Sequence, residues 1–156
     1  MYNRYYHTNR SYMKFPDKGV EILIPPQSKS IKVSAGIIDD WDTIKDYTEG
    51  YKPGREVINF EVVDNSGQVI TKFDPAIELK VYFTANDVKF AGGNLDDLKL
   101  AFLPVNDSRW IIFTEQKHDL ERHLDYWPPP TEGDLWIGYF KVKIFDWGDP
   151  SVSVGK

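Results

Sequence analysis

Cysteine is absent from this chain of 156 residues. The absence excludes disulfide bonds, thiolate metal sites and a cysteine nucleophile. It is compatible with a reducing cytoplasm and equally with a bacterial exterior, where proteins also fold without disulfides. In either compartment the fold must be stabilised by side-chain packing alone.

Long apolar runs are also missing. No segment approaches the roughly 20 consecutive apolar residues of a membrane-spanning helix, so we expect no membrane span. The first residues lack the apolar centre of a secretion signal. If the protein is exported, this sequence is therefore a mature form or an excised piece.

The sequence motifs of common enzyme classes are missing as well. The chain has no nucleophile elbow, no phosphate-binding glycine loop and no zinc-protease motif. Carboxylates could in principle pair as acid and base across a cleft, but their separation cannot be taken from the sequence. We therefore expect a protein that is not an enzyme and that holds no cofactor.

Positive charge is scarce in most of the chain. The net charge is −5, whereas nucleic acids and anionic membranes attract clustered positive charge. We expect neither as a partner. The charge is also uneven, because residues 1–18 carry four basic residues and one acidic residue, a net +3 that leaves −8 on the remainder.

Residues 1–18 form a basic, tyrosine-rich segment without a helical or a strand period, which predicts an extended N-terminal arm. Chain ends are disordered unless something holds them. Tyrosine rings could hold the arm by lying on an apolar surface of this domain or of a neighbour. The tyrosines concerned are Tyr2, Tyr5, Tyr6 and Tyr12. The competing interpretation is a disordered terminus.

Apolar residues at every second position are the clearest pattern in the remaining chain. Ile77, Leu79, Val81 and Phe83 alternate with polar residues, which is typical of a half-buried strand. The same criterion, together with turn residues between the runs, predicts eight strands, at residues 20–24, 31–37, 58–62, 69–73, 77–83, 98–103, 109–113 and 136–144. Strands at this spacing indicate an all-β sandwich or a related barrel, with residues 19–156 as one domain.

Two local signals refine this expectation. Residues 64–67 (DNSG) predict a tight turn between two strands. Thr84 as N-cap and Asp87 as its capping-box partner predict one short helix near residues 85–91, ended by Gly92 and Gly93. The charged, proline-containing stretch 114–133 is expected to be irregular.

Several short motifs resemble ZU5-type domains. Residues 19–26 (GVEILIPP) resemble the opening of such a domain, and residues 73–79 (FDPAIEL) resemble the step into a strand in ZU5-like repeats of bacterial surface proteins. Leu100, residues 107–108 (DS) and residues 110–113 (WIIF) match the segment that follows in those repeats, so the resemblance extends over residues 19–155. Gln27 departs from the small residue usual there, and the basic arm is no part of the pattern.

The resemblance implies an Ig-like or ZU5-like β-sandwich of about 7–9 strands that serves for interaction or as a spacer, and the family is not one of catalysts. It also implies an extracellular or cell-surface location.

Two clusters invite a metal assignment. His118 and His123, with Glu121 between them, would be separated by regular structure, so a solvated pair on a charged loop is favoured over a zinc site. The second cluster could offer oxygen ligands to calcium but lacks the glycine and glutamate of an EF-hand loop. It consists of Asp39, Asp40, Asp42 and Asp46. We expect no metal site, and His7 has no visible partner.

Aromatic residues in predicted loops are the best candidates for a binding site. Flat rings there can stack on sugar faces or anchor a protein, but we favour the interpretation that they fold back over the ends of the core, because large rings lower the free energy mainly by burying area. The residues are Trp41, Tyr47, Tyr51, Tyr126 and Trp127.

Two functional hypotheses follow. The first is a non-catalytic structural or adhesive interaction module of a cell-surface or extracellular assembly, in which the arm docks on a neighbouring copy or domain by adding a strand to an open sheet edge. The alternative is a carbohydrate-binding module that uses the loop aromatics.

Overall fold

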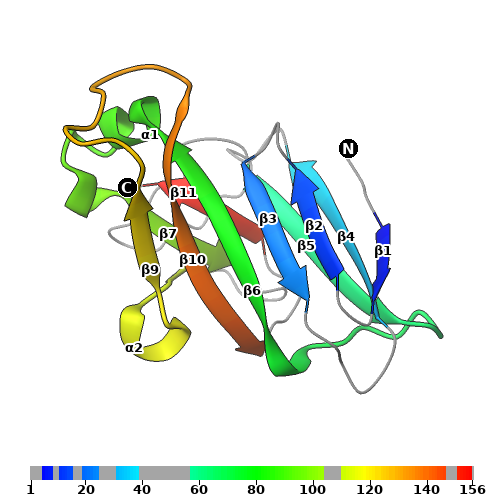
Figure 1. Ribbon diagram of the computed structural model, residues 1–156. Helices are drawn as coiled ribbons and strands as arrows, with labels where there is room; N and C mark the ends of the chain where they lie inside the picture. The colour runs from blue at the N-terminus through cyan, green and yellow to red at the C-terminus, as the bar shows by residue number, and fades with distance from the viewer. Residues whose placement is uncertain are drawn as a thin grey trace.

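Two antiparallel β-sheets make up most of the described chain, which confirms the expected all-β class (Figure 1). The computed structural model describes residues 5–8, 11–15, 19–24, 31–38, 57–103, 110–146 and 151–155. The six-stranded sheet has the order β1-β4-β5-β11-β7-β8, and the five-stranded sheet has the order β2-β3-β6-β10-β9.

The described residues contain eleven strands, more than the seven to nine expected. They are β1 (Tyr5–Thr8), β2 (Ser11–Phe15), β3 (Val20–Ile24), β4 (Ile31–Ile38), β5 (Val57–Asp64), β6 (Lys72–Thr84), β7 (Lys99–Leu103), β8 (Ile111–Ile112), β9 (Glu121–Leu124), β10 (Trp136–Asp146) and β11 (Ser151–Gly155). The helices are α1 (Ala85–Phe90), the 3-10 helix η3 (Leu95–Asp97) and α2 (Glu115–His118).

The long antiparallel pair β6–β10 forms the centre of the five-stranded sheet. The alternation at residues 77–83 is confirmed, since Leu79 and Phe83 have no exposed surface and pair across the ladder with Val142 and Gly138. Leu100 from β7 and Val62 from β5 belong to the same apolar cluster, so side chains from both sheets share one core. This shared core joins the two layers.

The segment predicted as an N-terminal arm supplies an edge strand to each sheet. Tyr5 and Tyr6 lie in β1, which pairs with β4, and Tyr12 lies in β2, which pairs with β3. His7 also lies in β1, opposite Lys32. Both strands thus pair with this chain itself, whereas Tyr2 lies outside the described residues.

Strand β6 runs through Pro75, where the sequence predicted two separate strands. Ile144 pairs with Ile77 and Asp146 with Lys72, so four residues of β6 oppose one of β10 in an irregular bulge. Pro75 lies in that bulge, before the pairing of β6 with β3 begins at Glu78. A residue without an N–H is tolerated there because the ladder is already interrupted.

The turn at residues 64–67 and helix α1 are both confirmed. The Asp64 side chain accepts from the Ser66 amide at 2.8 Å, and the Gly67 amide donates to the Asp64 carbonyl at 3.0 Å. At the start of α1, the Thr84 hydroxyl accepts from the Asp87 amide at 3.2 Å, while the Asp87 carboxylate accepts from the Thr84 amide at 2.8 Å. This is the reciprocal capping box that the sequence predicted.

The expectation of an irregular stretch over residues 114–133 is wrong for its first half, which contains α2 and β9. Thr114 caps α2, and Asp119 ends it in the left-handed conformation at φ 54°. Strand β9 is an edge strand whose residues are mostly exposed, so it carries no apolar alternation that would reveal it. Strand β11 was also not predicted.

Gly138 allows β9 to lie close to β10. A Cβ atom at this position would collide with the carbonyl oxygen of His123 and would lie 2.7 Å from the Phe83 ring. Gly138 pairs with Leu124 of β9 and Phe83 of β6. Glycine at this position therefore allows the backbone of β9 to approach β10 closely.

Candidate functional site

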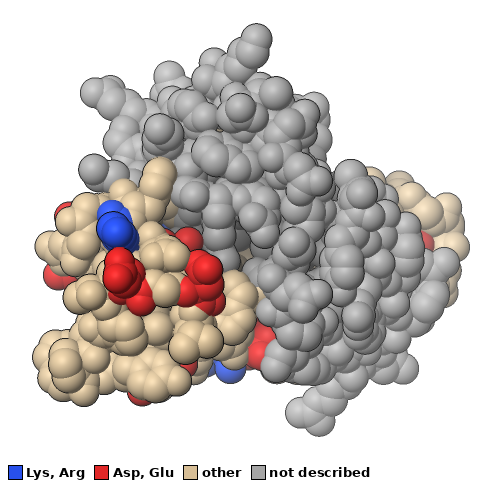
Figure 2. Space-filling model, turned by 90° about the horizontal axis from the view of Figure 1, so that it is seen from above, with Lys and Arg blue, Asp and Glu red and all other residues tan. Residues whose placement is uncertain are grey.

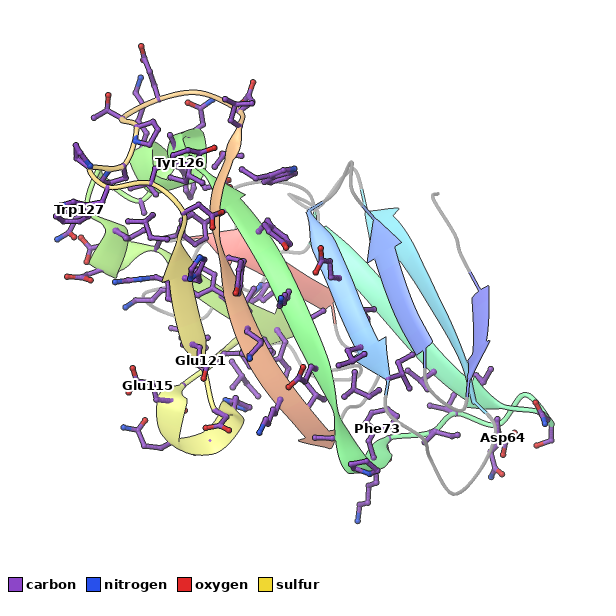
Figure 3. The ribbon with its side chains drawn as sticks, viewed as in Figure 1. Asp64, Phe73, Glu115, Glu121, Tyr126 and Trp127 are labelled. Carbon is purple, nitrogen blue, oxygen red and sulfur yellow. The ribbon has the colours of Figure 1, made fainter. Side chains whose placement is uncertain are left out.

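The segment from residue 125 to residue 135, which we call the tryptophan loop, joins β9 to β10 and carries the most exposed large apolar side chains. Trp127 is 87% exposed, Leu135 78% and Tyr126 52%. Figure 3 shows Trp127 at the outer edge of the molecule, away from the sheets. The prediction that loop aromatics fold back over the core is therefore wrong for Trp127.

Asn86 at the start of α1 fixes the far half of this loop. Its amide nitrogen Nδ2 donates to the Asp134 carboxylate at 2.7 Å, and its Oδ1 accepts from the Gly133 amide at 3.0 Å. Its backbone amide donates to the Gly133 carbonyl at 3.1 Å. Three hydrogen bonds of one residue thus anchor the Gly133–Asp134 end of the loop to α1.

The near half of the loop is fixed by the sheet. The Asp125 amide donates to the Ile137 carbonyl at 2.8 Å, which continues the β9–β10 ladder by one residue. The Asp125 carboxylate lies 2.9 Å from the His123 imidazole. The peptide bond between Trp127 and Pro128 is cis. Both ends of the loop are therefore anchored to regular structure.

A groove separates the loop from α1 and η3. It has a volume of about 560 Å³, with Val88 and Leu95 on one wall and Pro129 and Pro130 on the other. Lys89 and Glu132 line it as well and form an ion pair at 3.6 Å. The groove is apolar at its walls and carries charge of both signs.

Negative charge dominates the surroundings of the tryptophan loop. Residues 85–98 and 125–135 contain six carboxylates and one lysine, a net −5 within these segments, while Arg122 and Lys99 from outside them contact Asp96. Asp87 is buried in the capping box; the other five, Asp96, Asp97, Asp125, Glu132 and Asp134, are exposed. We call these two segments the acidic end. In the view from above, acidic side chains are prominent on the described surface (Figure 2).

A second and larger cleft, of about 680 Å³, lies between β9 of one sheet and β7–β8 of the other. Its apolar lining comes from core residues, and its charged lining residues are Asp96, Lys99, Glu115, Glu121 and Arg122. Arg122 pairs with Phe140 across the ladder and so lies on the face that the buried Phe140 ring occupies. Its guanidinium reaches η3, with Nη2 3.1 Å from the Asp96 carboxylate and Nη1 3.2 Å from the Leu95 carbonyl.

Most charged side chains that line the larger cleft form hydrogen bonds or ion pairs. The Lys99 ammonium donates to the Asp96 carbonyl at 3.0 Å, and Glu121 lies 3.2 Å from the Lys141 ammonium. The hydrogen bond to Glu121 raises the pKa of Lys141 above 10.5. The Lys99 contact is a hydrogen bond to a backbone carbonyl, whereas Arg122 with Asp96 and Lys141 with Glu121 are ion pairs.

The two histidines weighed as metal ligands lie in different environments. His118 ends α2, where its ring lies edge-on to Phe113 at 4.9 Å between centroids and its Nδ1 accepts from the Thr114 amide at 3.1 Å. Burial and the neighbouring Lys117 lower the pKa of His118 below 6.5. His123 instead stacks on Tyr139 at 4.9 Å. Within the described ranges, no three His, Cys, Asp or Glu side chains are placed to hold a metal ion.

Only some of the remaining predicted site residues lie within the described part of the chain. Tyr126 and Trp127 lie together in the tryptophan loop (Figure 3). Trp41, Tyr47 and Tyr51, and the acidic cluster Asp39, Asp40, Asp42 and Asp46, lie outside the described residues. Sequence reasoning missed Leu135 and Asn86. The Asn86 contacts join positions 47 and 48 residues apart, which no local motif encodes.

Among the helices of the described residues, none is long and apolar enough to cross a membrane. Comparison of the chain with protein-family models, with curated proteins and with solved structures finds no match.

Proposed function

We propose that this chain is a non-catalytic structural or adhesive interaction module of a cell-surface or extracellular assembly, built as an Ig-like or ZU5-like β-sandwich. Two antiparallel sheets with a common core support the sandwich assignment. The ion pairs that Arg122 and Glu121 of the larger cleft make support a binding role over a catalytic one. Contact with the partner is made through the tryptophan loop.

The observation that carries this proposal is the 87% exposure of Trp127 on a loop that Asn86 holds in place. A tryptophan side chain buries about 150–250 Å² when covered, which corresponds to roughly 4–6 kcal/mol before the costs of association. Exposed aromatic rings on rigid supports are typical anchors of protein interfaces. Little backbone freedom is lost when a partner covers a ring on a loop that is already anchored.

A photo-crosslinking amino acid at position 127 tests the proposal in the cells that produce the protein. The matched control is the same amino acid at Leu23, an apolar residue of β3 that is 39% exposed and distant from the loop (Figure 1). We expect a discrete crosslinked product from position 127 and none from position 23. Equal crosslinking from both positions, or none from position 127, contradicts the proposal.

A carbohydrate-binding module is the second candidate, favoured by the exposed rings of Trp127 and Tyr126 in one loop. Aromatic faces can stack on sugar rings, and neighbouring carboxylates can accept hydrogen bonds from sugar hydroxyls. A glycan array probed with the wild type, with Trp127→Ala and with Leu23→Ala distinguishes this case. Binding that Trp127→Ala abolishes and Leu23→Ala preserves supports it, and an empty array rejects it.

A further inference from the structure

The groove between the tryptophan loop and α1 is open to solvent at its rim. Lys89 of α1 and Glu132 of the loop form an ion pair across it, and their side chains are 67% and 75% exposed. Pockets for small molecules bury about 70–90% of the ligand surface, and a groove with so exposed a rim does not enclose a ligand to that degree. Pro129, two residues after Trp127, belongs to the lining. The groove therefore suits a segment of the larger partner that covers the loop.

The described residues of the groove walls lie in helices and in the loop, not in a strand. Val88 lies in α1, and Leu95 lies in η3. Pro129 and Pro130 on the opposite wall have no N–H to donate. A partner that adds a strand to a sheet needs a row of unpaired backbone groups, which these walls do not supply. Recognition therefore depends on apolar contact with the walls and on charge at the rim.

Negative charge prevails at this rim. Lys89 is the only basic residue of the acidic end. Three exposed carboxylates belong to the lining or lie within two residues of it, whereas the charge of a fourth, Asp96, is compensated by Arg122 at 3.1 Å. Three carboxylates against one ammonium leave a net −2, which favours a cationic partner over an anionic one. The three carboxylates are Asp97, Glu132 and Asp134.

We infer that the groove binds an extended segment of another protein in which apolar side chains are flanked by lysine or arginine. This inference rests on the proposed function and names the chemistry of the partner at the same surface. An apolar side chain of the segment lies between Val88 and Pro130, and a neighbouring basic side chain binds Glu132. Exposed ion pairs are weak, so the partner's cation can replace Lys89 at this carboxylate.

The Lys89–Glu132 ion pair allows a test that separates charge recognition from loop anchoring. Lys89→Gln and Glu132→Gln remove the same ion pair, so an effect through the position of the loop would have the same sign in both variants. Charge recognition gives opposite signs, because Lys89→Gln leaves Glu132 to the partner and Glu132→Gln removes that acceptor. Glu115→Gln is the matched control, since this carboxylate lies on α2, far from Trp127 (Figure 3).

An array of immobilised octapeptides, probed with the labelled wild-type chain, gives the first result. Two apolar residues of each octapeptide are flanked by Lys or Arg, by Asp or Glu, or by Ser or Gln, and a fourth set has the basic residues without the apolar ones. We expect the first set to bind most strongly. Added salt should weaken this binding, because the charges concerned are exposed.

Titration of the tightest octapeptides against each variant gives the second result. Lys89→Gln should tighten binding and Glu132→Gln should weaken it, each by about two- to fivefold. Glu115→Gln should leave the affinity unchanged. Circular dichroism establishes that every variant is folded.

Several outcomes overturn the inference: no binding to any octapeptide, no preference for the basic set with apolar residues, changes of the same sign in Lys89→Gln and Glu132→Gln, or an equal effect of Glu115→Gln. Binding to a glycan array without binding to octapeptides overturns it as well. If the octapeptides fail while position 127 still crosslinks to a protein in cells, this inference is wrong and the proposed function stands. Loss of that crosslink as well rejects both.

Discussion

The centre of the β6–β10 pair and the tryptophan loop are held in place in different ways. Phe83 has no exposed surface and contacts Phe140 at 5.3 Å between ring centroids, within a core that both sheets share. Trp127, only a few residues from the same strand pair along the chain, is 87% exposed. The loop depends on polar contacts from Asn86 and has few apolar ones. The stability of the core and the proposed recognition thus depend on separate residues, which can be altered independently.

Phe83→Ala should show the largest effect, because it removes a ring from the fully buried centre. Truncation of a buried phenylalanine costs about 3 to 5 kcal/mol in the free energy of unfolding. Urea unfolding followed by circular dichroism measures this loss. Leu23→Ala, at a position 39% exposed, is the control and should lose far less. Similar losses for the two variants would mean that the centre is not the stabilising region.

Asn86→Ala tests how the tryptophan loop is attached to α1. It removes the side-chain contacts to Gly133 and Asp134, and we expect a loss of about 1 to 2 kcal/mol in the free energy of unfolding. Hydrogen exchange of the Gly133 amide should accelerate, because its acceptor is gone.

Asn94→Ala is the matched control for this substitution. Asn94 caps η3 by accepting from the Asp96 amide at 3.0 Å and makes no hydrogen bond to the tryptophan loop among the described residues. Exchange at Gly133 should stay unchanged in this variant. Equal acceleration in both variants would show that Asn86 is not what holds the loop.

The His118 imidazole should give a smaller, pH-dependent effect. Its folded-state pKa is lowered below 6.5 by burial and by Lys117, so the unfolded chain binds a proton at a higher pH than the folded chain does. This contribution to stability is complete above about pH 6.5 and is lost as the pH falls toward the folded-state pKa. His118→Gln should flatten the decline in unfolding free energy just below pH 6.5, and His123→Gln serves as control. An unchanged slope in His118→Gln contradicts this assignment.

Trp127→Ala should have the smallest effect on stability. An exposed side chain contributes little to the folded state, and we expect a change within about 0.5 kcal/mol in the free energy of unfolding. Thermal and urea unfolding measure it, with Leu23→Ala as the reference. A loss above about 1 kcal/mol would indicate that the indole packs on the protein in solution.

Much of the fold could be predicted because its signals are local. Alternation at residues 77–83 identified the centre of β6, and Thr84 with Asp87 identified the start of α1. Each of these signals lies within a few residues of the element it predicts. The ZU5-like resemblance and the domain boundary at residue 19 stay predictions.

The rest could not be predicted because it depends on contacts between distant residues. Strand β9 has exposed residues and is defined by its pairing with β10. The N-terminal strands are defined by the edges of β3 and β4, which their own sequence does not reveal. In the candidate site, the position of Trp127 in a loop was predictable, but the attachment of that loop to Asn86 was not, because it joins residues more than 40 positions apart.

Arg122 has a consequence for how this protein avoids fibril formation. The residue belongs to an open edge strand but extends toward the inside of the molecule, where it reaches η3. A foreign strand that docked along β9 would have to accommodate this guanidinium and its ion pair with Asp96. An inward charge on an edge strand discourages further strand pairing, so β9 is a poor template for a foreign strand although its edge is open.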